Sequence, residues 1–226
     1  LQTDIRQLTA QLSGKLIADT MQLQVNAEKA VVSLEYDGER YLREAQVRMK
    51  TKARFIIPKM RIEFEPSDAT VNNMNATFSG SIENQPTQVL FDLNYGGKLL
   101  PLSEILAFVP SGYQSYLKGV EADGLVTSEG KIKGAYSDSL MPLMDLHILL
   151  QDGKLKYTGI PVSLSQMNGE VDFYSDLTND AISYVNIRRF SANSPKSSFQ
   201  TSGRITHFLT DMHCDLTSEG DLELSE

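Results

Sequence analysis

The sequence predicts an all-β protein, mainly antiparallel, with one or two short helices and a long sheet that curls into a groove or an open, barrel-like half-pipe. Apolar and polar residues alternate through most of the 226 residues, which is typical of strands with one buried face. Asp-Gly and Asn-Gly pairs recur among these runs and predict tight turns. One short stretch, near residues 101–118, has helical spacing instead.

The first part of the chain contains three alternating runs, which predict three half-buried strands. Their apolar positions are Leu8, Ala10, Leu12, Gly14 and Leu16, then Met21, Leu23, Val25 and Ala27, then Val32, Leu34 and Tyr36. Asp37-Gly38 follows the third run and predicts a hairpin, with the next strand beginning near Tyr41.

Later runs supply the residues that we assign to the lining of the predicted groove, because they are large and apolar and lie at every second position. These residues are Met60, Ile62, Phe64, Val89, Phe91, Leu93, Leu146, Ile148, Leu150, Leu155 and Tyr157. The run ending at Leu150 and the run beginning at Leu155 flank Asp152-Gly153, which predicts a second hairpin. Asn168-Gly169 predicts a tight turn or a bulge.

A helix is predicted in the middle of the chain, within a run that begins at Leu99. Ser103 is a suitable cap and Pro110 ends the run, and apolar residues at i, i+3, i+4 and i+7 form one face: Leu102, Ile105, Leu106 and Val109. This helix either closes one end of the sheet as part of the core or plugs the groove.

The helical insert near residues 101–118 divides residues 1–98 from residues 119–226 within a single β-rich domain. After it, the glycine-punctuated stretch from Gly119 to Gly134 predicts a pair of amphipathic strands. At about 8–12 residues per strand the chain would form more than ten strands, and so wide a sheet either curls into a trough or splits into a sandwich. Alternation alone leaves both architectures open.

A weak internal repeat accompanies the alternation. TFSGSIENQ around Gly80 and QTSGRITHF around Gly203 share a Thr-x-Ser-Gly-x-Ile core. The repeat indicates either a sheet that grows by similar strand units or a chance likeness between two amphipathic strands.

Composition excludes several classes of function. The net charge of −8 argues against nucleic acid as a partner, and the chain has no apolar run of about 18 residues that would span a membrane. The only cysteine is Cys214, and we expect it and His213 to point to opposite faces of a strand rather than to bind a metal. We predict no metal and no cofactor.

Catalytic motifs are missing as well. The three histidines, His147, His207 and His213, lie in alternating runs without ligand spacing, and nothing selects a pair of acids from the abundant carboxylates. We therefore expect no catalytic residues and a protein that is not an enzyme.

A basic stripe stands out in this acidic chain, with six cations and no acid between its first and last member. It consists of Arg48, Lys50, Lys52, Arg54, Lys59 and Arg61. Such a stripe would contact anionic lipid headgroups, or its charges would pair across the sheet with acids such as Glu63, Glu65 and Glu83.

Three stretches resemble the carboxy-terminal region of the AsmA-like family, which includes the TamB-related proteins: SEILAFVP, LKGVEADGLVTSEGKIKG and HILLQDGKLKYTGIPVSLSQMNGEVDF. The resemblance covers Leu99 to Phe208. It implies a long curved sheet with an apolar concave face, in a bacterial envelope protein that is anchored in a membrane and concerned with lipid transport or outer-membrane assembly.

The function expected from residues and resemblance together is the shielding of lipid acyl chains in an apolar β-groove. We expect a periplasmic piece of a longer protein, tethered to the inner membrane by a segment outside this chain, with lipid or the envelope membrane as its partner. Two alternatives remain: a module that binds an envelope protein by β-strand addition, and a carbohydrate-binding β domain, although the chain has no Trp to form a stacking platform.

Overall fold

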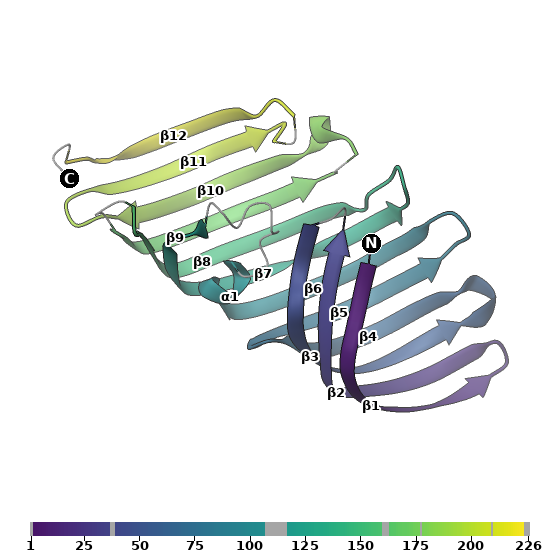
Figure 1. Ribbon diagram of the computed structural model, residues 1–226. Coiled ribbons are helices and arrows are strands. Elements are labelled where there is room, and N and C mark those ends of the chain that lie inside the picture. The colour runs from purple at the N-terminus through teal and green to yellow at the C-terminus, as the bar shows by residue number, and fades with distance from the viewer. Residues whose placement is uncertain are drawn as a thin grey trace.

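The computed structural model confirms the all-β prediction and describes residues 2–36, 39–106, 117–159, 163–176, 178–208 and 210–223. Its described strands form one twelve-stranded sheet (Figure 1). The strands are β1 Gln2–Ile17, β2 Thr20–Tyr36, β3 Glu39–Ile56, β4 Arg61–Val71, β5 Met74–Asn84, β6 Val89–Pro101, β7 Val120–Tyr136, β8 Leu143–Tyr157, β9 Ser163–Ser175, β10 Tyr184–Asn193, β11 Ser198–Thr206 and β12 His213–Asp221.

The sheet is an antiparallel meander in which every strand pairs with the strand that follows it in the chain. The order runs from β1 to β12 and does not close into a barrel, so β1 and β12 are the outer strands. The sandwich that the alternation left open is therefore not formed by the described strands. Strand β6 precedes the helix and β7 follows it, yet they pair directly, so the sheet continues across the helical insert.

The sheet segregates its side chains by polarity. Residues directly opposite in an antiparallel pair lie on the same face, and the register aligns apolar residues across successive strands. One such row consists of Phe78, Tyr95, Gly130, Leu146, Phe173, Val185, Ile205 and Cys214. We call the side that carries this row the apolar face and the opposite side the polar face.

Small side chains form most of the buried core. The buried apolar residues are Ala27, Ala30, Ala45, Ala53, Met74, Val126, Met167 and Ala192. The large apolar side chains beside them are mostly half-buried. This is the burial expected where one layer of strands carries the core without a second layer of sheet.

Bulges interrupt the long strands, which bend partway along their length (Figure 1). In β8 the register slips between Leu150 and Gly153, where Asp152 has a φ of 49°. The hairpin predicted at Asp152-Gly153 is thus wrong, because β8 continues through this pair as a bulge. Similarly, one strand, β7, replaces the predicted pair, with a register shift between Asp123 and Leu125.

Three local predictions change near the turns. Met60 was expected in a strand, but it follows the 3₁₀ turn η1 (Ile57–Lys59) with a φ of 47°, and β4 begins one residue later. The predicted helix is shorter, because Leu99 still belongs to β6 and α1 covers Leu102–Leu106. By contrast, the pairing of Tyr36 with Glu39 confirms that β2 and β3 form a hairpin.

The two copies of the weak repeat share one backbone feature. Gly80 has a φ of +123° and Gly203 a φ of +142°, and an added Cβ would overlap the carbonyl oxygen of Asp92 or Asp215 on the next strand. Both positions require glycine, because L side chains rarely adopt this φ. The repeat therefore corresponds to a repeated local geometry within the sheet.

Candidate functional site

The register places most of the predicted groove residues on the apolar face. Phe64 lies opposite Gly80, which lies opposite Leu93, and the row continues into β7 and β8 at Ile132 and Met144. The residues of the predicted lining that lie on this face are Ile62, Phe64, Val89, Phe91, Leu93, Leu146, Ile148, Leu150, Leu155 and Tyr157. Met60 lies apart from them, 50% exposed in its turn.

The apolar face keeps its apolar character even where it carries a hydroxyl. The Tyr95 hydroxyl lies 2.8 Å from the Ser128 hydroxyl on the paired strand β7, and burial raises the pKa of Tyr95. The phenol is therefore neutral at physiological pH, and its polar atom has a partner. Edge-to-face packing of Phe64 and Phe78, with centroids 5.6 Å apart, adds aromatic surface to the same face.

The predicted plug helix lies against strands β6 and β7. Leu102, Ile105 and Leu106 are half-buried in α1, and Glu104 accepts a hydrogen bond from Asn73 at 3.2 Å. Val109 lies outside the described residues. The described turn of helix therefore packs beside the sheet through its apolar side chains.

The basic stripe lies on the polar face, away from the predicted lining. Arg54 forms a salt bridge of 2.6 Å with Glu63, and Arg61 contacts Glu63 at 3.0 Å and Glu83 at 3.7 Å. These contacts are the cross-strand pairs that the sequence left open as an alternative. Exposed pairs of this kind contribute little stability, of the order of 0–1 kcal/mol.

The remaining cations of the stripe have different surroundings. Lys50 lies opposite Asp68 on β4, and Lys59 lies in η1. Within the described part of the chain Arg48, Lys50 and Lys52 form no salt bridge, so their charges face solvent on the polar face.

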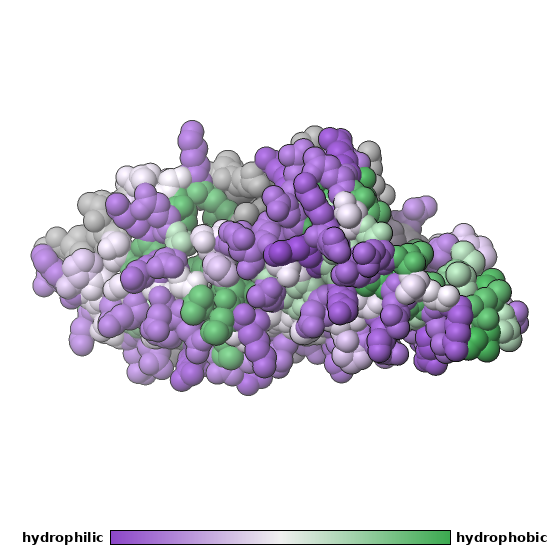
Figure 2. All heavy atoms as spheres, turned by 90° about the horizontal axis from the view of Figure 1, so that it is seen from below, coloured by the Kyte–Doolittle hydropathy of each residue, from purple (hydrophilic) through white to green (hydrophobic). Residues whose placement is uncertain are grey.

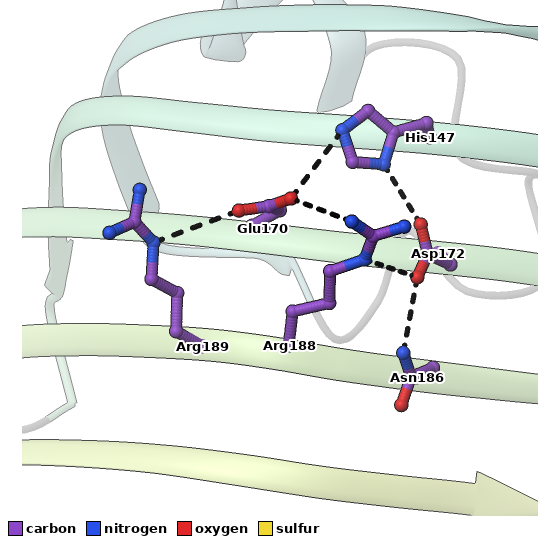
Figure 3. A network of polar contacts seen from close by, with 6 residues as sticks. All are labelled: His147, Glu170, Asp172, Asn186, Arg188 and Arg189. Carbon is purple, nitrogen blue, oxygen red and sulfur yellow. Dashed lines mark hydrogen bonds and ion pairs between the residues drawn. The ribbon is translucent and has the colours of Figure 1, made fainter.

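A network of polar side chains, which the sequence analysis missed, crosses β8, β9 and β10 on the polar face (Figure 3). Asp172 lies at its centre: one carboxylate oxygen is 2.9 Å from His147 Nδ1, and the other accepts hydrogen bonds from Arg188 Nε at 2.7 Å and Asn186 Nδ2 at 3.1 Å. Arg188 also donates to Glu170 through Nη1 at 3.1 Å. Arg189 lies 3.8 Å from Glu170.

The network saturates its central carboxylate. The hydrogen bond from the Arg188 guanidinium, supported by His147 and Asn186, holds the pKa of Asp172 well below its usual range despite partial burial. A carboxylate that is so well paired is a poor general base at neutral pH. The geometry therefore indicates a structural clamp between three strands rather than a catalytic centre.

Replacing Asp172 with asparagine is expected to lower the free energy of unfolding at pH 7 by about 1–2 kcal/mol. The folded-state pKa is depressed, so the carboxylate stabilises the fold above its unfolded pKa of about 3.9, and this contribution is lost as the pH falls further. The difference between wild type and Asp172→Asn should therefore shrink below about pH 4. Urea unfolding across this pH range measures it.

Asp145→Asn is the matched control, because Asp145 is an exposed acid on the same face of β8. It should change stability by less than about 0.5 kcal/mol. Equal effects of the two substitutions, or a difference that does not depend on pH, would contradict the clamp.

Hollows on the polar face are shallow and lined by hydroxyl and amide groups. One of about 550 Å³ lies over β4 to β7, with Thr70, Asn75, Thr77 and Asn94 in its wall. Among the described residues, no three His, Cys, Asp or Glu side chains are placed to bind a metal ion together. The described helices also include none with the length and apolar character needed to cross a membrane.

Comparisons with protein-family models, with curated proteins and with solved structures found no match to this chain. The class that the structure itself defines is a single-layer, open antiparallel β-sheet with one apolar and one polar face. The argument for function therefore depends on these two faces.

Proposed function

We propose that this chain is a non-enzymatic lipid-binding segment that shields acyl chains against the apolar face of its sheet. The observation that carries the proposal is the segregation of side chains: the apolar rows cross the whole described sheet, and the described residues provide no second layer of sheet to cover them. Acyl chains are a suitable cover, because they match this surface chemically.

The energetics favour long apolar ligands over compact ones. Each methylene that moves from water onto apolar side chains contributes about 0.8 kcal/mol. Rows of similar side chains, such as Leu93, Ile132 and Met144, provide comparable contacts along their length. A ligand can therefore slide between equivalent positions instead of being held in one pocket, as lipid transport requires.

In this proposal the bent strands form the walls of a trough. The bulges of β3, β4, β6, β7 and β8 increase local twist and bend each strand, and the bend seen in Figure 1 supports a curved apolar surface. Headgroups would remain in water at the open side.

The resemblance to AsmA-like proteins suggests the setting. We propose a periplasmic location, with tethering to the inner membrane by a segment outside this chain, and a role in phospholipid transport or outer-membrane assembly. In this setting the basic stripe would contact a membrane surface from outside the trough, since Arg48, Lys50 and Lys52 lie on the polar face.

Lipid binding by the purified, delipidated chain tests the proposal. After incubation with vesicles of phosphatidylethanolamine and phosphatidylglycerol, and separation from them, native mass spectrometry should detect protein carrying phospholipid. A fluorescent fatty acid should bind saturably and be displaced by the same phospholipids. Protein that remains lipid-free in the first experiment and fails to bind the fluorescent fatty acid would overturn the proposal.

A further inference from the structure

The outer strand β1 leaves large apolar side chains uncovered. Leu12 is 68% exposed and Leu16 62% exposed, whereas Ala27 and Ala53, on the same face of β2 and β3, are buried. Natural sheets usually protect such edges with charges, proline or a covering element. The stretch from Ala10 to Ile17 contains only one charge, Lys15, and no proline.

The other outer strand, β12, has the complementary character. All of its residues are exposed, and its polar-face positions include Asp215, Glu219 and Asp221 without any Lys or Arg. Two β12 edges would repel each other, because their acids would face one another. A basic or neutral edge is the favoured neighbour.

We propose that a second copy of this chain pairs head to tail, with the β12 edge of one copy against the β1 edge of the next. Because the twelve strands form an antiparallel meander, β12 runs opposite to β1, and a β12 strand placed on the next copy's β1 continues the antiparallel order. The apolar faces of both copies then lie on the same side.

The lengths and charges of the two edges select a register. The stretch of β1 from Ala10 to Ile17 pairs with β2 without a register shift and is nearly as long as the nine-residue β12, which is also regular. Setting Lys15 opposite Asp215 places a cross-strand ion pair on the polar face. The same register sets Leu216 opposite Gly14, which has no side chain to obstruct it.

Such contacts do not close on themselves, so copies would add in series. The twist between neighbouring strands would turn the series into an open helical arrangement with one continuous apolar face. In Figure 2, hydrophobic residues gather at the right-hand end, where Figure 1 places turns of the N-terminal strands. This assembly does not depend on lipid binding, so its failure and that of the proposed function are distinguishable.

Sedimentation velocity of the intact chain over a wide concentration range tests the pairing. The average mass should rise with concentration and pass the mass of a dimer. Lys15→Glu and Asp215→Lys should each weaken association about tenfold through like-charge contacts. The double substitution restores the ion pair in reverse and should return association to within about threefold of the wild type.

Lys52→Glu is the control, because Lys52 is an exposed cation of the polar face that lies opposite the neutral Gln24, away from both edges. It makes the same charge change and should leave association unaltered. The proposal is overturned if the chain stays monomeric throughout, if its mass stops at that of a dimer, or if the double substitution fails to rescue.

Discussion

Replacing Gly80 with alanine is expected to destabilise the protein by about 2–4 kcal/mol, the largest effect that we predict for a single methyl group. Gly80 lies in β5 between Phe64 on β4 and Leu93 on β6, with a φ of +123°. An added Cβ would overlap the carbonyl oxygen of Asp92, an atom of the backbone that cannot move without disturbing the ladder. Urea unfolding followed by circular dichroism measures the loss.

Gly96→Ala is the matched control, because Gly96 lies in the neighbouring strand β6. The nearest atom to its added Cβ is the Thr77 hydroxyl oxygen at 3.1 Å, the end of a rotatable side chain. We expect a change of about 1 kcal/mol or less there. A Gly80→Ala variant that matched wild type within about 0.5 kcal/mol would show that the strand does not need this backbone conformation.

Replacing Ile148 with asparagine is expected to weaken binding of a fluorescent fatty acid about tenfold. Ile148 lies in the middle of β8 on the apolar face, opposite Ser128 on β7 and Val171 on β9. An amide at this position would lose hydrogen bonds to water wherever an acyl chain covers it, and this loss opposes binding. A titration of the refolded, delipidated variant measures the affinity.

The neighbouring residue provides the control. Leu149 is equally half-buried but lies on the polar face, opposite Thr127 and Glu170. Leu149→Asn should leave the affinity within about twofold of the wild type. If both substitutions weakened binding equally, with equal loss of stability, the effect would come from folding, and the assignment of lipid to the apolar face would fail.

The strands were predictable from the chain because alternation is a local property. The runs around Leu12, Leu93 and Ile148 each place apolar residues two apart, and each lies in a strand with those residues on the apolar face. Turn dipeptides were less reliable. Asp37-Gly38 separates two paired strands, whereas Asp152-Gly153 forms a bulge within one, since the same pair of residues suits either geometry.

The polar network could not be predicted for a different reason. His147, Asp172 and Arg188 occupy ordinary polar positions in three strands and form no sequence motif. They meet because the register of β8 and β9 sets His147 opposite Asp172, and because a shift between Ile187 and Arg189 moves β10 by one residue. Only the paired strands specify these offsets.

Alternation with a period of two is enough to specify antiparallel strands with one oily side, because it depends on backbone geometry that each residue shares with its neighbours. The single open sheet, the bulges that bend it and the clamp around Asp172 depend on contacts between residues far apart in the chain. Those contacts exist only once the strands have chosen their register, so tertiary structure alone decides them.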